Sequence, residues 1–428
     1  MDTLEIKDNK TVNLVAVATE ELSGSEILLK GLIAEGVDTI FGYPGGAIMP
    51  IYDAIYDYKD ELNHVLVRHE QGATHAAQGY ARSSGRVGVV FATSGPGATN
   101  LITGIADAQI DSTPMVCITG QVFAHLLGTD AFQETDVINI TTPITKWNYQ
   151  VTDASEIAEV LAKAFYIAKS GRPGPVLIDI TKNAQIQKVA FKGYQSCRHI
   201  RSYRPYPIVR NSYIEQAAEL INSAKKPFVL FGQGVLLGNA EKEFKAFVEK
   251  AGIPSAWTIM GVGAIPTDHP LNVGMLGMHG NYGPNVLTNE CDVLIAVGMR
   301  FDDRVTGRLD KYAKQAKVIH LDIDPSEIDK NVINNIIVKL EQLGAPKGSI
   351  MNIEKTHEKI NFGKLEGIGI YIDGVNLSKN VYEECDINFV ITEIHRLIQT
   401  DYIINRYLIE IITTHDNNNS LIPLRCIR

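Results

Sequence analysis

The sequence has few cysteines, and no two of them form a CxxC motif. The five are spread along the chain as Cys117, Cys197, Cys291, Cys385 and Cys426. An odd number of widely spaced cysteines argues against a disulfide framework and against a zinc knuckle. We therefore expect reduced thiols in a cytoplasmic protein.

Long runs of one residue class are also missing. No apolar run reaches the roughly 18 residues that a membrane-spanning helix needs. The first ten residues are polar and acidic, so we expect no signal peptide. There is no long run of lysine and arginine, and the formal net charge is −9. Because binding of duplex nucleic acid usually requires a basic face, we exclude nucleic acid as a partner.

What is present is typical of a globular protein. The chain has 428 residues, of which 45% are hydrophobic and 21% are charged. This length favours two or three domains. We find no internal repeat and no coiled-coil heptads.

The first predicted domain covers residues 23–184 and follows a flexible lead at 1–22. Ser23 and Glu26 have the spacing of a capping box, and the helix that they begin should end before Gly36. Apolar runs then alternate with helical patterns such as 70–83 and 98–110. Buried strands separated by helices indicate a parallel sheet covered on both sides. The predicted strands are 37–41, 64–67, 87–92, 114–119 and 174–180.

A linker at 185–209 and a second domain at 210–340 follow. Basic, aromatic and proline residues between Arg201 and Pro207 indicate the linker. Helical patterns at 213–224 and 240–251 then alternate with apolar runs at 226–232, 253–257, 291–298 and 317–324. The predicted fold class is therefore α/β, with two consecutive parallel-sheet domains.

The character of the sequence changes near its end. Ala345 is the only alanine after Asn331, and isoleucine, asparagine and lysine become frequent. Residues 388–404 fit one helix and one strand. We expect 341–428 to be a diverged or truncated C-terminal region.

Four segments of the first domain contain residues suited to binding or chemistry. In 41–55 a strand runs into Tyr43, Pro44, Gly45 and Gly46, and a helix follows near Ile48. At such a corner a ligand can approach the backbone, although many such turns are purely structural. In 67–82, Glu70 lies where a strand ends and a helix begins. It could also be an ordinary first-turn acid, which the helix dipole favours.

The third segment, 91–100, places Gly95 and Pro96 before a helix. Such a loop can hold an anion, or it can be a plain turn; neither GxGxxG nor a Walker lysine is present. The fourth consists of 128–136 and 144–149. There Phe132, Gln133 and Lys146 could line a pocket for a small anion, although these residues also suit a surface loop.

Taken in order, these segments resemble the thiamine-diphosphate enzymes. HEQGATHAAQGYAR, TSGPGATN and GTDAFQETD together are similar to the large catalytic subunits of acetolactate synthase, and the similarity extends over residues 23–332. It implies a pyrimidine-binding domain followed by an FAD-binding central domain. It also implies a transferase of branched-chain amino-acid biosynthesis, which decarboxylates pyruvate and transfers the two-carbon unit to pyruvate or 2-oxobutanoate.

The resemblance gives Glu70 a role. It implies that this carboxyl binds the ring nitrogen N1′ of the cofactor's aminopyrimidine, so that the thiazolium C2 can lose a proton. Gly46, Gln133 and Lys146 would be the other residues at the reaction centre, with Gln133 close to Glu70. Phe132, Gln133 and Lys146 would line the substrate entrance. The implied contacts to thiamine diphosphate are Tyr43, Pro44, Gly45, Glu70, Gly95 and Pro96.

The second domain is similar in five fragments that resemble the family's FAD-binding segments. Gly232 and Gly234 follow a strand and could admit a dinucleotide backbone. Arginines could pair with its diphosphate, and an aspartate at a strand end could accept from a ribose or adenine donor. The implied FAD contacts are Arg172, Gly232, Gly234, Leu276, Gly277, His279, Gly298, Arg300, Asp303, Arg304, Asp322 and Asp324.

The family also implies Mg²⁺, which a third domain holds through Gly-Asp-Gly and a later asparagine. The nearest string here is Asp373-Gly374 with Asn376, preceded by Ile372 where the signature has glycine. We therefore name no metal ligand in this chain. The family further implies a homodimer or tetramer, and it includes members that bind a small regulatory subunit. Two alternatives stay open: another carboligase such as glyoxylate carboligase, and a non-catalytic FAD-binding remnant.

Overall fold

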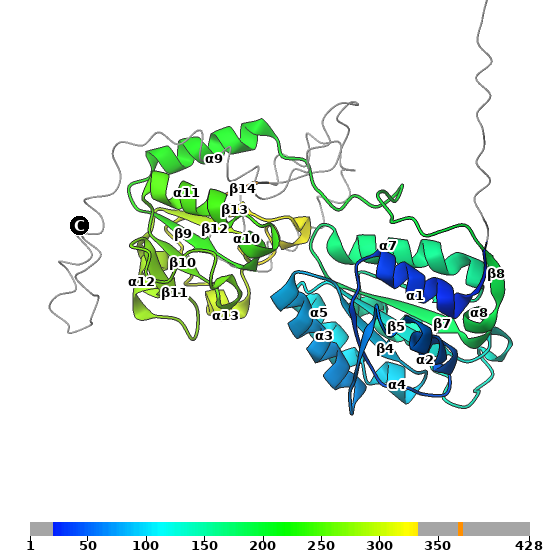
Figure 1. The fold of residues 1–428 in the computed structure, drawn as a ribbon. Coiled ribbons are helices and arrows are strands. Elements are labelled where there is room, and N and C mark those ends of the chain that lie inside the picture. Colours follow the sequence, from blue (N-terminus) through cyan, green and yellow to red (C-terminus); the bar gives the residue numbers. More distant parts are fainter. Residues whose placement is uncertain (1–19, 333–366, 371–428) are drawn as a thin grey trace, which may run out of the picture. The chain divides into compact units, whose positions relative to one another are not determined.

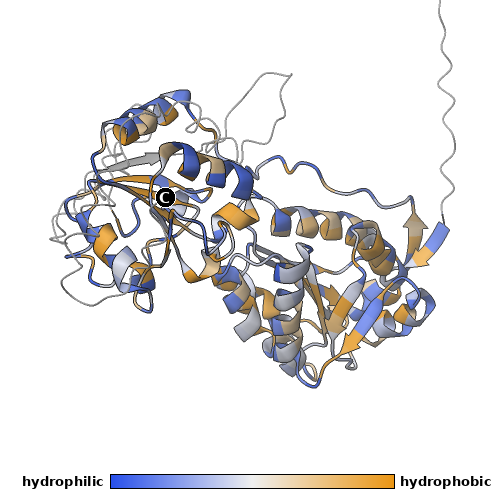
Figure 2. Cartoon of the chain, turned by 60° about the vertical axis from the view of Figure 1, so that its left-hand side comes forward, coloured by the Kyte–Doolittle hydropathy of each residue, from blue (hydrophilic) through white to orange (hydrophobic). Residues whose placement is uncertain are grey.

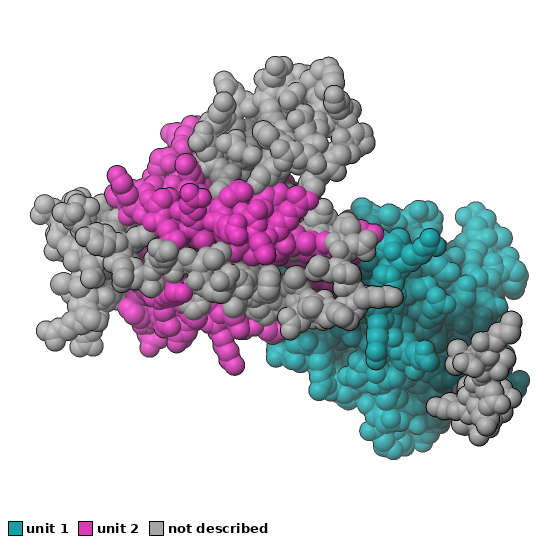
Figure 3. All heavy atoms as spheres, turned by 90° about the horizontal axis from the view of Figure 1, so that it is seen from above, with its two compact units in different colours: residues 1–203 teal, residues 204–428 magenta. Residues whose placement is uncertain are grey.

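The computed structural model describes residues 20–332 and 367–370 (Figure 1). The chain forms two compact units, which divide between Tyr203 and Arg204 (Figure 3). This division falls inside the predicted linker. The exact domain bounds stay predictions.

Unit 1 is built on a parallel sheet in the order β3-β2-β4-β5-β7-β6. All five strands predicted in this unit are present. The strands are β2 (Thr39–Gly42), β3 (Asn63–Leu66), β4 (Gly88–Ala92), β5 (Met115–Gln121), β6 (Trp147–Val151) and β7 (Pro175–Thr181). β6 is an edge strand that we expected to be loop. Only Val151 of its five residues is fully buried, so its sequence lacks the continuous apolar run of the central strands.

Helices cover both faces of this sheet. One face packs on α1 (Gly24–Ala34), α2 (Met49–Ile55), α7 (Ile157–Lys169) and α8 (Lys182–Ile186). The other packs on α3 (Glu70–Ser84), α4 (Pro96–Thr99), α5 (Ile102–Ile110) and α6 (Val137–Thr141). Successive residues of a strand point to opposite faces, and β4 accordingly sends Phe91 to the first layer and Val90 to the second. This double burial explains the near-continuous apolar runs.

The capping box that we predicted at the start of α1 is present. The Ser23 hydroxyl accepts from the Glu26 amide, and the Glu26 carboxylate accepts from the Ser23 amide at 2.7 Å. After the helix, Gly36 adopts a φ of 80°, as a helix end favours.

Two parts of the predicted lead and linker are wrong. Residues Glu20–Ser23 form β1, which pairs antiparallel with β8 (Lys188–Phe191). The flexible lead therefore does not extend over 20–22, and the linker does not include the last residues of α8 or β8. A two-stranded ribbon between segments some 170 residues apart leaves no local sequence pattern.

Unit 2 repeats the architecture with a parallel sheet in the order β11-β10-β9-β12-β13-β14. Its strands are β9 (Pro227–Phe231), β10 (Ser255–Trp257), β11 (Asn272–Met275), β12 (Val293–Val297), β13 (Lys317–Leu321) and β14 (Gly367–Ile370). α9 (Asn211–Ser223), α10 (Gln233–Leu237) and α11 (Glu241–Ala251) pack on one face, and α12 (Tyr282–Glu290) and α13 (Asp303–Thr306) lie on the other. Figure 2 shows the hydrophobic colour in strands of both units and on parts of the helices. β14 comes from the region that we expected to be diverged.

The fold class of two consecutive parallel α/β domains is confirmed. The helix and strand predicted in 388–404 lie outside the described residues. Within residues 20–332, no helix combines the length and apolar character needed to cross a membrane.

Candidate functional site

The loops that follow β2 and β4 meet at the carboxyl edge of the unit 1 sheet. Here the strand order reverses, because β3 lies on one side of β2 and β4 on the other. The Tyr43 amide donates to the Phe91 carbonyl at 3.3 Å, and the Ala47 amide donates to the Thr93 hydroxyl at 3.2 Å. In doubly wound sheets, ligands bind at such a reversal.

Gly45 is required for this contact. A Cβ at position 45 would lie 2.4 to 2.8 Å from atoms of the Thr93 side chain. Gly46 differs, because a Cβ there would meet no atom within 4 Å; its carbonyl accepts from the Lys182 ammonium at 3.1 Å. Tyr43 is 41% exposed. Packing therefore explains Gly45, whereas the space beside Gly46 is free for a ligand.

Glu70 is the first residue of α3. The N-terminus of this helix is capped by the His69 ring, which accepts from the Gln71 amide. The start of this helix lies beside the loop that follows β4, and the Glu70 side chain is only 7% exposed there. We call the place where Glu70 and the loops after β2 and β4 meet the Glu70 crevice. Its Oε2 accepts from the Asn100 amide group at 2.9 Å. Among the described residues, Asn100 is the only hydrogen-bond partner of this carboxyl.

The other oxygen of Glu70 borders a glycine. A Cβ on Gly97 would lie 3.3 Å from Glu70 Oε1 and 2.7 Å from the Thr93 side chain. Because Gly97 has no side chain, it leaves the approach to Oε1 open. A buried carboxyl with one oxygen fixed and the other available can share a hydrogen-bonded proton with a ligand nitrogen.

Two further polar groups lie beside Gly42, at the end of β2. Among the residues that the structure describes, the buried Tyr52 hydroxyl and His64 Nε2 have no hydrogen-bond partner, and the two rings meet edge-on at 5.1 Å between centroids. Burial raises the pKa of Tyr52, and the charge of Glu70 raises it further. Burial also lowers the pKa of His64. Both groups are therefore neutral near pH 7.

Gln133 reaches the same crevice from the loop at 128–136. It has a φ of 59°, and a Cβ on Gly95 would lie 2.7 Å from its carbonyl oxygen. Glu70 and Gln133 therefore border the same short loop, Gly95–Gly97. Phe132 beside it is 87% exposed.

Lys146 is directed elsewhere. Its ammonium donates to the carbonyls of Ile167 and Ser170, at the C-terminal end of α7, at 2.5 and 2.6 Å. A cation at this position is favoured by the helix dipole. The structure does not bring Lys146 to Glu70, and its role at a substrate entrance stays a prediction.

In unit 2 the strand order reverses between β9 and β12, and the predicted glycines lie at this point. The Gly232 amide donates to Val297 and the Gly234 amide donates to Gly298, at 3.0 and 2.8 Å. A Cβ on Gly234 would lie 2.5 Å from the Gly298 Cα. The backbones of the two loops are thus in direct contact. Close packing therefore explains these glycines independently of the predicted FAD contact.

The loop after β11 contacts α13 at this edge, because the Met278 amide donates to the Arg304 carbonyl at 2.7 Å. Gly277 has a φ of 97°, and its amide and carbonyl are both bonded to the Asn285 side chain at 2.9 Å. Leu276 is buried, whereas His279 is exposed. Arg304 pairs with its exposed neighbour Asp303 at 3.8 Å.

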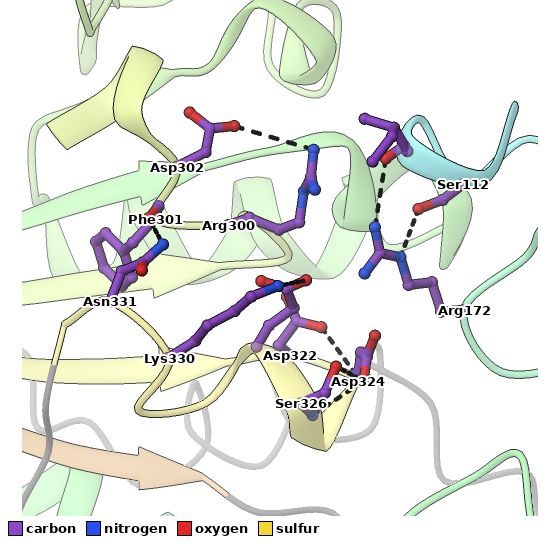
Figure 4. A network of polar contacts seen from close by, with 12 residues as sticks. Ser112, Arg172, Arg300, Phe301, Asp302, Asp322, Asp324, Ser326, Lys330 and Asn331 are labelled. Carbon is purple, nitrogen blue, oxygen red and sulfur yellow. Dashed lines mark hydrogen bonds and ion pairs between the residues drawn. The ribbon is translucent and has the colours of Figure 1, made fainter. Parts of the chain in front are cut away.

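The remaining predicted FAD residues make contacts within their own units (Figure 4). Arg300 pairs with Asp302 at 3.9 Å. Asp322 accepts from the Asp324 amide at 2.8 Å, and Asp324 accepts from the Ser326 hydroxyl at 2.7 Å. In unit 1, Arg172 donates to the Ser112 hydroxyl at 2.8 Å. Because Arg172 belongs to the other unit, its place in an FAD site stays a prediction.

Sequence reasoning missed three residues of the Glu70 crevice. Asn100 and Thr93 both lie in the segment 91–100, but nothing local shows that Asn100 reaches a glutamate 30 positions earlier. Tyr52 resembles an ordinary helix residue. For Asn100 the available signal was its place one turn beyond the Gly-Pro-Gly loop.

The nearest candidate for a metal string, Asp373 to Asn376, lies outside the described residues. Within residues 20–332, no group of three or more His, Cys, Asp or Glu side chains is arranged to hold a metal ion.

Comparison with known proteins identifies both units. Residues 22–140 match the family model "Thiamine pyrophosphate enzyme, N-terminal TPP binding domain", and residues 214–342 match "Thiamine pyrophosphate enzyme, central domain". Acetolactate synthase of Mycobacterium bovis is 51% identical over 315 residues, which are 74% of this chain and 51% of that protein.

Two further relatives agree. The acetolactate synthase large subunit of Corynebacterium glutamicum is 50% identical over 74% of this chain and 50% of its own length. That of Parasynechococcus marenigrum is 47% identical over 84% of this chain and 59% of its own. The chain therefore spans about half the length of these relatives. It belongs to the thiamine pyrophosphate enzymes and is a homologue of acetolactate synthase large subunits.

Proposed function

We propose that this chain contributes the glutamate side of a thiamine-diphosphate site in an acetolactate synthase large subunit. The proposed reaction decarboxylates pyruvate and transfers the two-carbon unit to pyruvate or 2-oxobutanoate. The observation that carries the proposal is the Glu70 carboxyl, which is 7% exposed and held through one oxygen by Asn100.

The geometry around Glu70 fits the aminopyrimidine of the cofactor. Asn100 fixes the carboxyl, and Gly97 leaves the approach to Oε1 open. A carboxyl at Oε1 can hold a proton toward a ring nitrogen. When bound, thiamine diphosphate supplies the electron sink for decarboxylation. The contribution of this chain is to place and hold that proton on a carboxyl that is only 7% exposed.

The rest of the crevice would bind and orient the ligands. Gly46 and Tyr43 offer free space and an exposed ring beside Glu70's crevice. Gln133 and the exposed Phe132 would meet the substrate from the facing loop. Pro44, Gly95 and Pro96 belong to the two loops that form the walls.

We also propose that unit 2 binds FAD at its strand reversal. The residues assigned to FAD in unit 2 follow the carboxyl ends of β9, β11, β12 and β13 along one edge of the sheet. The amides of Gly232 and Gly234 are already used by the facing loop, so they would not bind the diphosphate directly. Arg300 and Arg304 are the cations that would meet it.

The oligomeric state, the regulatory subunit, the metal ion and the cellular compartment are part of this proposal. A homodimer or tetramer, and a small regulatory subunit, would follow from kinship with the large subunits. Mg²⁺ would be needed for the cofactor's diphosphate. Cys117 and Cys291 are buried free thiols, which suits a reducing cytoplasm.

The test uses the full chain with thiamine diphosphate, Mg²⁺, FAD and pyruvate. Acetolactate formation and thiamine-diphosphate binding are measured for the wild type and for Glu70→Gln, with Glu61→Gln, at an exposed position, as the matched control. We expect Glu70→Gln to abolish turnover and Glu61→Gln to leave it unchanged. Turnover that survives Glu70→Gln would refute the proposal.

Two other outcomes identify the alternatives. FAD retention with neither turnover nor thiamine-diphosphate binding would indicate a non-catalytic remnant. Faster carboligation of glyoxylate than of pyruvate would indicate the glyoxylate carboligase class instead.

A further inference from the structure

A buried carboxyl that the proposed chemistry does not use lies in the unit 1 sheet, on the strand next to its edge strand β6. Asp179 on β7 has no exposed surface. It accepts from the Thr119 hydroxyl at 2.6 Å and from the side-chain amides of Gln121 and Gln150 at 3.1 and 2.9 Å. Burying a carboxyl is costly unless donors surround it, so a group placed here with three donors needs a reason beyond packing.

Gln121 connects this carboxyl to the loop that carries Gln133. Its side-chain nitrogen donates both to Asp179 and to the Thr135 carbonyl, the latter at 3.0 Å. Its side-chain oxygen accepts from the Val122 amide at 2.9 Å. One buried amide, itself 1% exposed, therefore holds both the point where the chain leaves β5 and the point where it returns.

The loop between these points, residues 122–136, is in a conformation that must be held. Gln133 and Asp130 both have positive φ, which side chains rarely adopt. The Glu134 carboxylate accepts from the amides of Gly128 and Ala131 and so closes the loop on itself. Those contacts shape the tip, but they do not attach it to the sheet.

We propose that Asp179 is a positioning residue that, through Gln121, fixes loop 122–136 against the crevice. Its acceptor oxygen orients the Gln121 amide so that the second hydrogen reaches Thr135. This holds the Gln133 carbonyl beside Gly95. The positioning of the loop by Asp179 does not depend on the function proposed above. The effect of this positioning on substrate binding does rest on that function.

The test measures hydrogen exchange by mass spectrometry on the full chain. Gln121→Met keeps the volume but removes the link, and Asp179→Leu removes the acceptor. Thr119→Val is the matched control, because it removes a donor to Asp179 but leaves the link to the loop. We expect the first two variants to raise exchange tenfold or more in peptides from 122–136, with no change in β2 and β4.

Asp179→Asn should restore slow exchange, because its amide oxygen can still accept from Gln121. If Asp179→Leu does not fold, Gln121→Met against Thr119→Val decides the matter alone. Unchanged exchange in Gln121→Met would overturn the proposal. So would an equal rise in Thr119→Val, or a rise throughout unit 1, since either would indicate general loosening.

Kinetics supply the second readout. With pyruvate as substrate, Gln121→Met should raise KM at least fivefold and leave the affinity for thiamine diphosphate unchanged. A fall in kcat alone, at unchanged KM, would contradict the positioning role. If the wild-type chain shows no turnover but the loop loosens as expected, the proposed function fails and the positioning role stands.

Discussion

The side chains of Asn100 and Glu70 should contribute a measurable coupling free energy to the stability of unit 1, which replacing Asn100 by alanine removes. The amide group of Asn100 donates to the carboxyl at 2.9 Å, and that carboxyl is 7% exposed. Leaving a buried acceptor without its donor costs about 1–3 kcal/mol. Because Asn100 is only partly buried, we take a value in the lower half of this range and expect a coupling energy of about 1.5 kcal/mol.

The assay is a double-mutant cycle of Asn100→Ala and Glu70→Ala, followed by thermal unfolding. The chain has two tryptophans, Trp147 in unit 1 and Trp257 in unit 2. In a Trp257→Phe background, the fluorescence of Trp147 therefore reports on unit 1 alone. For a unit of this size, 1.5 kcal/mol corresponds to a shift in midpoint of about 3–6 °C.

The cycle also gives the outcome that would refute the reasoning. If the two substitutions are additive within about 0.5 kcal/mol, the hydrogen bond does not couple the two side chains in solution. The carboxyl of Glu70 would then not be fixed by Asn100, and the orientation assigned to Oε1 would lose its support.

Two further outcomes concern packing and pH. Gly104→Ala should destabilise unit 1 by about 1–3 kcal/mol, because the new Cβ would lie 1.9 Å from the Thr74 hydroxyl. In Gly79→Ala, on the same helix layer, the new Cβ meets no atom within 4 Å, and the substitution should stabilise by about 0.5–1 kcal/mol. Equal unfolding midpoints for the two variants would contradict the close approach of Gly104 to Thr74. His320 is buried and donates to the Met299 carbonyl, and burial lowers its pKa to about 4 from 6.5. The unfolded chain takes up this proton first, so stability is complete above pH 6.5 and falls by up to about 3 kcal/mol as the pH drops from 6.5 to 4. In His320→Gln, the urea-denaturation midpoint should depend less on pH across that window. If the pH dependence of the midpoint is unchanged, another group is responsible for it.

Much of the fold was predictable because double burial leaves a strong local signal. β4 and β7 are buried at every position, so their apolar runs stand out in the sequence. The capping box before α1 is equally local. β6 and β1 were not predictable, because one is a half-buried edge strand and the other depends on a partner some 170 residues away.

The same distinction holds for the candidate site. Glu70, Gly45 and Gly95 lie in motifs at strand ends, and parallel strands bring such ends to one edge. Asn100 and Glu70 are brought together only by the tertiary fold, and no sequence spacing predicts their contact. Lys146 fits the family's pattern by position, yet its ammonium contacts the end of α7, which depends on a side-chain rotamer.

The ribbon of β1 and β8 affects how unit 1 is made during synthesis. β1 is complete once Ser23 has been added, but its partner ends at Phe191. At about 5–20 residues per second, a ribosome needs roughly 8–34 seconds to cover that interval. Throughout this time β1 exposes an unpaired edge, a template for pairing with a neighbouring nascent chain. Its short length, four residues including Glu20 and Glu21, limits that risk, and the strand that closes the unit is also the one that delivers the chain to unit 2.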